Sequence, residues 1–573
     1  MSEKKISKIS NIESIFYQFY RHPFIAAALV CFMSLLMPTG QPFFPNSLCV
    51  AIWIAALGGA AAYCAYKNLP DDNGRKNAVI IASAGIVCAL LFLYQTFAQQ
   101  SYSIIVMNGG LAICAGVFFY LLAMKKLSVK NTILIIFAAG FIMRLSYIIA
   151  MSAGSIQHDV YSLGQNAGHA GYIEYLYANG HLPDFDVRQV DQFYHPPLHH
   201  ALAALWMRLQ SFIGISYEQA YENIQHLTLF YSTCCLIISY KIFRRLGLSK
   251  AGLITATAII AVCPTFYIMA GSMNNDILSV TFMLGAILNT LYWYKSRSLK
   301  RILCIALCVG LGMLTKLSVW MVAPAIGCVF IYVFFSELKS FKKYIVQYAA
   351  FLCVCAPIGL FWSVRNFILW KVPFSFVQRL TERSSQYIGD IPLMQRLFDL
   401  SPYQFVDPAP QFTMYKGDYN EYNPLIAFFK TSMFDEGIAT RRFPRIAGFN
   451  QILFWSAVVL GVLGFCAMIF MFIKKNSKMD AVQKSFIGLL YATIFGMYYY
   501  FCIDFPHVCT MNVRYGVPLI VIGALSVGYL TMELFRMKKK LATVCAGAIC
   551  SVIGIYALSG YAVYNLVVLS VIK

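Results

Sequence analysis

The sequence predicts an all-α protein that crosses a membrane many times and carries further helices along the outer membrane surface. Of its 573 residues, 59% are hydrophobic and only 12% are charged, so apolar side chains exceed what one water-soluble core of this length buries. The net charge of +21 comes from short Lys/Arg clusters between apolar segments. That pattern is typical of cytoplasmic loops and excludes a nucleic-acid-binding stripe.

The apolar segments predict about fifteen crossings, several of them shorter than the roughly 20 residues of an upright span. Placing every basic cluster on the cytoplasmic side fixes the direction of each crossing. The predicted spans are residues 23–38, 47–66, 77–97, 103–123, 131–151, 226–243, 251–270, 277–294, 301–315, 317–335, 345–369, 449–473, 484–502, 514–535 and 542–568.

One segment of intermediate length is predicted not to cross. An outer loop begins at residue 152, the next basic cluster starts at Arg244, and only one crossing fits between them. Leu198 to Ile213 is short and contains Arg208. We therefore expect it to form a juxtamembrane or re-entrant helix at the outer interface.

This topology divides the chain into four parts. They are an N-terminal extension of four spans (1–125), a catalytic membrane core (126–369) that includes a first outer loop (152–225), an extracytoplasmic segment (370–448) and C-terminal membrane helices (449–573).

The two long outer segments hold most of the carboxylates. Of 24 acidic residues, seven lie in 152–225 and eight in 370–448. Most of them, including nearly all those in 370–448, are expected to be solvated, as is usual for outer loops. Asp159 differs because it follows an apolar span by eight residues and stands beside His158. A carboxylate there can accept a proton from an incoming hydroxyl, although an N-cap of the following segment explains it equally well.

Four further polar sites interrupt apolar segments at the same predicted outer face. They are Asn274-Asn275-Asp276, Lys316 in LTKLSVW, Arg365 in FWSVRNFILW and Arg514 in MNVRYGVP. A single charge at the end of a span is readily explained by snorkelling or by a helix cap. Four such sites at one face, together with Asp159, indicate a cavity that binds an anion such as phosphate.

In this order the motifs resemble a known enzyme family. QHDV, YHPPLHH, SMNND, LTK, VRN, KTSMFDE and VRYGVP follow one another between about residues 131 and 535. The set is similar to type C integral-membrane glycosyltransferases of family 39, which include protein O-mannosyltransferases and the lipid A aminoarabinose transferase. The added N-terminal spans and the short 370–448 segment depart from the better-known members.

The resemblance implies a sugar donor linked to polyprenyl phosphate, a lipid, glycan or protein acceptor, and inversion at the anomeric carbon. Asp159 corresponds to the catalytic base of the family. The leaving phosphate would be bound by the cations Arg365, Arg514 and Lys316. The residues expected to line the sugar or acceptor pocket are His158, His169, Glu174, His195 and Asp276.

Several of these assignments have alternatives. A structural role before Pro196-Pro197 suits His195 as well as a binding role does, and Asp276 also fits a helix cap. His195 and His199 have the spacing of zinc ligands, but no metal site is expected. No cofactor is required, and a divalent cation is left open. The expected location is a bacterial plasma membrane, with the active site extracytoplasmic.

The main competing function is a secondary transporter or flippase of a lipid-linked or anionic substrate. Transporters of this kind show related halves and charges near the middle of the membrane. The sequence shows no convincing internal repeat, and its informative charges gather at one face. The glycosyltransferase interpretation is therefore preferred.

Overall fold

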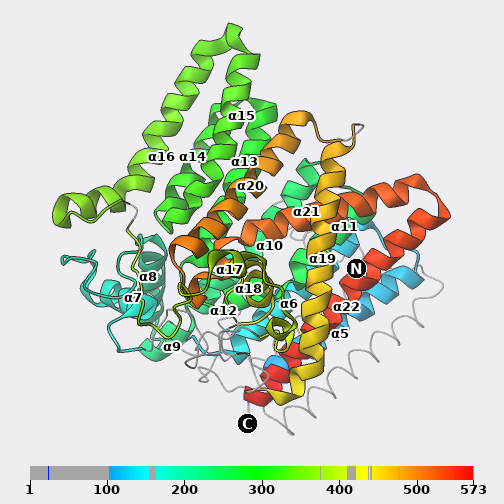
Figure 1. The fold of residues 1–573 in the computed structure, drawn as a ribbon, viewed down its shortest axis with the longest axis horizontal. Coiled ribbons are helices and arrows are strands. Elements are labelled where there is room, and N and C mark those ends of the chain that lie inside the picture. Colours follow the sequence, from blue (N-terminus) through cyan, green and yellow to red (C-terminus); the bar gives the residue numbers. More distant parts are fainter. Residues whose placement is uncertain are drawn as a thin grey trace, which may run out of the picture.

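A computed structural model describes residues 24, 102–153, 163–374, 376–409, 421–435, 438, 442–475 and 478–571 (Figure 1). Over these residues the protein consists of helices and connecting loops, and the predicted all-α membrane fold is confirmed. The predicted spans 23–38, 47–66 and 77–97 lie outside the described residues.

The α-helices are α5 (Tyr102–Ala123), α6 (Val129–Ala150), α7 (Gly168–Asn179), α8 (Leu198–Phe212), α9 (Tyr217–Glu222), α10 (Gln225–Arg245), α11 (Lys250–Val262), α12 (Pro264–Gly271), α13 (Asp276–Ser296), α14 (Leu299–Met313), α15 (Ala323–Ser336), α16 (Phe341–Trp370), α17 (Leu393–Phe398), α18 (Pro424–Met433), α19 (Ala447–Ile473), α20 (Ala481–Asp504), α21 (Val517–Met537) and α22 (Lys540–Val571). The 3-10 helices are η2 (Leu317–Val322), η3 (Leu338–Ser340), η4 (Pro402–Phe405), η5 (Pro444–Ile446), η6 (Val508–Thr510) and η7 (Val513–Tyr515).

Nine helical segments of the described chain are long and apolar enough to cross a membrane, and a bent pair makes a possible tenth. Together with two shorter helices, these segments correspond to the predicted spans that fall within the described residues. The predicted span 103–123 is helix α5, whose apolar stretch is Val106–Leu122, and the predicted span 301–315 is α14, with 15 residues. Alpha-helices of this length cover only about 22 Å at 1.5 Å per residue.

The bent pair forms where one straight span, 251–270, was predicted. Helices α11 and α12 meet at an angle of 40° beside Cys263. Pro264 opens α12 and has no N–H to donate to the carbonyl of Ile260 four residues earlier. The fully buried guanidinium of Arg144 in α6 donates to that carbonyl over 3.3 Å and to the carbonyl of Ala261 over 3.0 Å. Arg144 thus satisfies backbone groups that the break leaves open inside the membrane.

Helices α11 and α21 approach closely because glycines face each other. A Cβ atom on Gly252 would lie 2.4 Å from the carbonyl oxygen of Gly528, and one on Gly528 would lie 2.5 Å from that of Gly252. Small residues at facing positions are the usual means of close packing between membrane helices. The contact packs the middle of α21 against α11, and α21 follows η7, which carries part of the candidate site.

The predicted cytoplasmic clusters gather at one end of the helices and are tied together by ion pairs. Lys295 at the end of α13 is 3.0 Å from Asp480, which caps α20. Arg297 is 3.1 Å from Glu337. Lys474 pairs with Glu533 between the ends of α19 and α21. The N-terminus of α13 and the loop before α21 therefore lie at the opposite end of their helices.

At that opposite end, the first outer loop folds into α7, α8 and α9, which Figure 1 shows together at the lower left. Helix α7 ends at Gly180, whose φ of +74° suits a residue without a Cβ atom. Arg208 of α8 donates to the carbonyl of Tyr177 over 2.6 Å and joins the two helices. Helix α8 is not among the candidate spans, and its Phe212 is 90% exposed. These features agree with the predicted interfacial helix.

The segment 370–448 contributes α17, η4, α18 and η5, and α18 packs against α12 (Figure 1). One of its acids is an exception to the expected solvation. Glu421 has 3% of its side chain exposed and lies 2.5 Å from the ammonium group of Lys430 in α18, which is 2% exposed. A buried carboxylate is tolerated when a cation compensates it, and the pair fixes α18 against the following helices.

Candidate active site

The loop that carries Lys316 is held by backbone and amide hydrogen bonds from two other segments. The amide N–H of Leu198, which follows the two prolines of YHPPLHH, donates to the carbonyl of Leu314 over 3.1 Å. The side chain of Asn275 donates to the carbonyl of Thr315 over 2.9 Å. Both contacts satisfy carbonyls at the end of α14 that lack an intrahelical partner. Lys316 itself adopts an extended conformation and turns its side chain toward α13.

Asp276 occupies the first turn of α13, where the partial positive charge of the helix N-terminus favours a carboxylate. Its backbone N–H donates to the side chain of Asn274 over 3.1 Å. The carboxylate forms a hydrogen-bonded ion pair with the ammonium group of Lys316. Asp276 is therefore not the helix cap that was its alternative assignment, because Asn275 takes the N-cap position.

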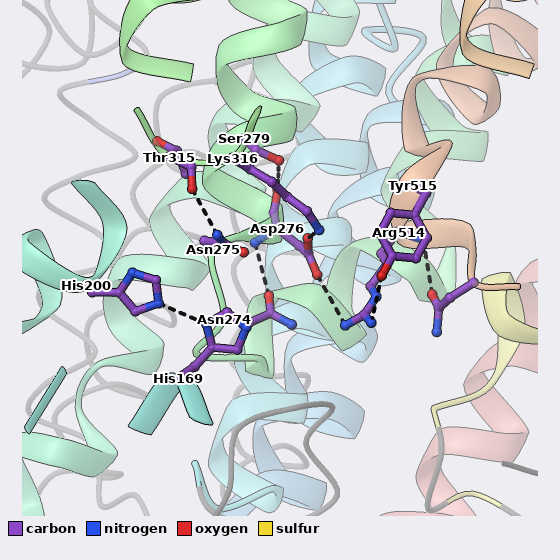
Figure 2. Close-up of polar contacts among 11 residues, drawn as sticks. His169, His200, Asn274, Asn275, Asp276, Ser279, Thr315, Lys316, Arg514 and Tyr515 are labelled. Atoms are coloured by element: carbon purple, nitrogen blue, oxygen red, sulfur yellow. Dashed lines mark hydrogen bonds and ion pairs between the residues drawn. The ribbon is translucent and has the colours of Figure 1, made fainter. Parts of the chain in front are cut away.

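Arg514 approaches the same carboxylate from the other side, as Figure 2 shows. Its Nη1 atom is 3.8 Å from Oδ2 of Asp276. The short helix η7 that presents it is fixed by two hydrogen bonds: Asn512 accepts from the Arg514 N–H over 3.1 Å, and the N–H of Val513 donates to Thr431 of α18 over 2.9 Å. Two predicted phosphate-binding cations thus meet at one predicted pocket residue.

Tyr515 completes this cluster. Its ring centroid is 4.7 Å from Nζ of Lys316 and 5.0 Å from Cζ of Arg514, and its hydroxyl accepts from Arg514 over 3.0 Å. The side chains of Asp276, Lys316 and Arg514 are 3%, 11% and 10% exposed. Because little solvent screens these charges, two cations and one carboxylate carry a net charge of +1 in a confined site. Tyr515 was missed by the sequence analysis although VRYGVP contains it.

A stack of histidine rings borders the cluster. His169 lies between His195 and His200, with ring centroids 5.3 Å and 5.1 Å away. Its Nδ1 atom is 2.8 Å from Nε2 of His200 (Figure 2). His169 is also within electrostatic range of Asp276. The predicted pocket residues His169 and His195 are therefore brought together beside the charged cluster.

Burial keeps the two histidines of α8 neutral. It lowers the pKa of His199 to about 4, and with the neighbouring His169 it lowers the pKa of His200 well below its usual value. Nε2 of His199 is bonded to the carbonyl of Met273 over 2.7 Å, which places α8 against the loop before α13. The described residues contain no group of three or more His, Cys, Asp or Glu side chains arranged to hold a metal ion.

Arg365, the third predicted cation, contacts a different region. Its guanidinium donates to the carbonyl of Pro183 and lies over the rings of Trp362 and Trp370, 5.1 Å and 4.9 Å from their centroids. The indole of Trp362 in turn donates to the carbonyl of Tyr194 over 2.9 Å. Arg365 thus holds the first outer loop against α16. Its contact with donor phosphate stays a prediction.

The remaining predicted residues have separate environments. Glu174 accepts hydrogen bonds from the Gly164 N–H over 3.1 Å and from the Tyr217 hydroxyl over 2.8 Å, and so connects α7 to α9. Its role in the pocket stays a prediction. Asp159 and His158 lie outside the described residues.

A second carboxylate, which belongs to the motif KTSMFDE, lies within electrostatic range of Arg514. Asp435 follows α18, accepts a hydrogen bond from the Tyr147 hydroxyl over 3.0 Å and is within electrostatic range of Arg514. Burial raises its pKa to about 7. This acid belongs to the site rather than to a solvated loop.

Residues 194–362 match the family model of dolichyl-phosphate-mannose-protein mannosyltransferases. The match covers the HPPL block, the Asn274-Asn275-Asp276 loop and Lys316, and it ends shortly before Arg365. It confirms the predicted resemblance to type C glycosyltransferases of family 39 and the predicted class of enzyme. No curated protein shows a significant match to the chain.

Among solved structures, the chain is similar to the oligosaccharyltransferase AglB of Archaeoglobus fulgidus in complex with an inhibitory peptide and a dolichol-phosphate (12% identity, TM-score 0.46) and to ArnT of Cupriavidus metallidurans in the apo state (12% identity, TM-score 0.45). The similarity covers 77% of this chain and 77% of ArnT, but the chain spans only 56% of the length of AglB. At these values only a coarse helical arrangement is shared.

Proposed function

We propose that this chain, a type C glycosyltransferase of the family-39 kind, moves a sugar from a polyprenyl-phosphate donor to an acceptor at the extracytoplasmic face of the membrane. The observation that carries the proposal is the convergence of Lys316 and Arg514 on Asp276 at the ends of membrane helices. Asp276 and Lys316 lie within the segment that matches the family model, and Arg514 belongs to the motif VRYGVP.

The charge of this cluster suits a phosphodiester. Lys316, Arg514 and Asp276 together leave one positive charge, and a polyprenyl-phosphate sugar carries one negative charge. When the sugar leaves, the lipid becomes a phosphate monoester and gains a second negative charge. Fixed cations in a site with little water stabilise charge that develops in the transition state more than charge already present in the ground state.

In the transfer step, an acceptor hydroxyl or amine attacks the anomeric carbon while the bond from that carbon to the phosphate oxygen breaks. The electron pair of the broken bond goes to the phosphate, beside Lys316 and Arg514. We assign the proton of the acceptor to the carboxylate of Asp159, which would act as general base. A single displacement of this kind inverts the anomeric configuration.

An apolar cavity supports a lipid-linked donor. It has a volume of about 160 Å³ and lies between α18, α19, α20 and α21. Phe428, Phe429 and Met433 of α18 line it, and α18 ends two residues before Asp435. An isoprenoid chain in such a cavity would bury its apolar surface while its phosphate remained near the cations.

The orientation follows from the basic clusters. Lys295, Lys474 and Arg536 lie at the helix ends opposite the site, and an excess of Lys and Arg marks the cytoplasmic side. The site would then face outward, with α8 at the outer interface.

The test is a transfer assay with the purified protein, a labelled polyprenyl-phosphate sugar and a panel of lipid, glycan and protein acceptors. We expect Asp159→Asn to lose nearly all transfer while it retains donor binding. Asp186→Asn is the matched control, because Asp186 lies in the same outer segment but pairs with Arg188 near the surface, and we expect it to keep its activity.

Two results would contradict the proposal. Full transfer by Asp159→Asn would remove that residue as the base. Movement of lipid-linked substrate across proteoliposomes, without transfer to any acceptor, would favour the alternative function of a transporter or flippase.

A further inference from the structure

We propose that Lys241, Arg245 and Arg301 form a site that binds the phosphate group of an anionic phospholipid, at the end of the helices opposite the candidate active site. These three half-buried side chains are called the cation cluster. The ion pairs formed within the described part of the chain include none of them. The site takes a different ligand from the transfer reaction and does not depend on that reaction.

Two arginines from different helices lie over the same aromatic ring. Cζ of Arg245, in the last turn of α10, is 5.3 Å from the ring centroid of Tyr292. Cζ of Arg301, in the first turn of α14, is 4.5 Å from the same centroid. Tyr292 belongs to α13, which packs against both helices. Because the face of an aromatic ring attracts cations, Tyr292 holds the two guanidiniums near each other despite their equal charges.

Hydrogen bonds orient both guanidiniums but use few of their donors. Nε of Arg245 donates to the carbonyl of Leu291 over 3.3 Å. Nη1 of Arg301 donates to the side chain of Asn289 over 3.1 Å. Among the described residues these are the acceptors that the two guanidiniums find. A guanidinium carries several N–H groups in a planar fork that matches phosphate, so most donors of both arginines are available to one anion.

Lys241, four residues before Arg245 in α10, adds a third cation. Its Nζ atom is 4.2 Å from the ring centroid of Phe24, and its charge is within electrostatic range of Arg301. Like charges that are partly withdrawn from water repel each other more than charges on an open surface do. A bound phosphate would replace this repulsion by attraction.

An excess of cations at this end is ordinary in itself, because Lys and Arg mark one side of a membrane protein. Orientation does not, however, require half-buried cations without counter-charges. Lys295 and Arg297 lie at the same end and have carboxylate partners at 3.0 Å and 3.1 Å. Arg297 is half-buried like the cation cluster. The cation cluster lacks the compensation that these neighbours have, which points to a ligand.

The surroundings favour a lipid over a soluble anion. Helix α14 begins at Leu299 without a side-chain cap, so the N–H groups of its first turn add positive potential beside Arg301. Leu299 and Leu307 of α14 are 46% and 43% exposed, as expected of a helix that borders the acyl chains. Basic pockets between the ends of membrane helices are a known setting for phospholipid head groups. A phospholipid would place its phosphate at the cation cluster and its acyl chains along α14.

The experiment measures binding of phosphatidylglycerol to the full-length protein in a neutral detergent by native mass spectrometry, with zwitterionic phosphatidylcholine as the reference lipid. We expect the wild type to bind phosphatidylglycerol more tightly than phosphatidylcholine. In the double variant Arg245→Gln/Arg301→Gln the dissociation constant of phosphatidylglycerol should rise roughly tenfold or more, since charge-assisted hydrogen bonds from both arginines are lost.

The matched control is Lys539→Gln/Lys540→Gln. It removes the same charge from exposed positions at the same end of the helices, and the dissociation constant should change less than about twofold, as expected for well-screened surface charges. Arg301→Lys keeps the charge and removes only the planar fork, so it tests the site even if the double variant fails to fold. We expect it to weaken phosphatidylglycerol binding about threefold.

Four results would overturn the inference. They are equal losses in the two double variants, unchanged binding in Arg301→Lys, equal affinity of the wild type for the two lipids, and binding of soluble glycerol phosphate as tight as that of phosphatidylglycerol. Lys316→Met should retain its binding of phosphatidylglycerol, because Lys316 belongs to the candidate active site. Loss of binding in Lys316→Met would place the lipid at the active site and would also overturn the inference.

Discussion

Replacing Lys316 by Met should remove most donor affinity while leaving the fold intact. The ammonium group pairs with Asp276, and its side chain is only 11% exposed. Without it, Arg514 still compensates Asp276 from 3.8 Å, and the summed charge of these three residues falls from +1 to zero. A donor phosphodiester would then meet no excess positive charge.

The magnitude can be bounded. A unit charge about 4 Å from a phosphate contributes roughly 4 kcal/mol at an effective dielectric constant of about 20, before desolvation is subtracted. Hydrogen bonds to charged groups contribute a net ~1.5–3 kcal/mol. We therefore expect the dissociation constant of a prenyl phosphodiester to rise roughly 10- to 150-fold in Lys316→Met, as measured by isothermal titration calorimetry in detergent.

Lys474→Met is the matched control. Lys474 also pairs with a largely buried carboxylate, Glu533, whose side chain is 5% exposed, but it does so at the opposite end of the helices. Both variants remove one partner of an ion pair, but a second cation stays near each carboxylate, Arg514 for Asp276 and Arg536 for Glu533. Both should therefore lose less than the roughly 3–5 kcal/mol of a fully broken buried pair. Only Lys316→Met should lose affinity. Equal donor affinity in the two variants would refute the assignment of Lys316 to the phosphate.

Three further predictions concern other contacts. Arg514→Lys keeps the charge but loses the planar fork bonded to Tyr515, and we expect about a tenfold loss of donor affinity. Arg365→Ala should lose less donor affinity than Arg514→Lys. A larger loss in Arg365→Ala would contradict the placement of the phosphate. Arg144→Met leaves the carbonyls freed at Pro264 without their side-chain donor. Each unsatisfied group costs about 1–3 kcal/mol, so the unfolding temperature should fall by several degrees. An unchanged unfolding temperature would disprove the role given to this arginine. Gly528→Ala places a Cβ atom 2.5 Å from a backbone oxygen, whereas a Cβ atom in the control Gly547→Ala would have nothing within 4 Å. Only Gly528→Ala should lower thermal stability. Equal stability of the two variants would show that the α11–α21 contact is not tight.

Most of the membrane architecture could be predicted because hydrophobicity is a local property of the sequence. Each described apolar segment formed a helix near its predicted bounds. Leu198–Phe212, which the order of the basic clusters kept out of the count of spans, forms helix α8. The break at Cys263 was not predicted. Its apolar sequence continues unchanged through Pro264, and the compensating donor, Arg144, comes from a helix more than a hundred residues earlier.

The site was predicted in part for a similar reason. Position relative to the membrane placed Asp276, Lys316 and Arg514 at the same face, and the structure brings them together. The same argument placed Arg365 with them, but Arg365 contacts the Pro183 loop instead. The position of a residue along the membrane normal does not say where on that membrane face it lies. Glu421 and Asp435 were not singled out from the acids of 370–448, nearly all of which were expected to be solvated. Their contacts with Lys430 and Tyr147 depend on how the segment folds.

The most direct test of the central claim is a structure of the full-length protein with a polyprenyl-phosphate bound in a lipid environment. The account predicts phosphate oxygens within hydrogen-bonding distance, about 2.7–3.2 Å, of the Lys316 ammonium and the Arg514 guanidinium, with the prenyl chain directed toward the cavity bounded by α18 and α21. A polyprenyl phosphate bound at Arg365, or at the basic end of the helices opposite the site, would contradict it.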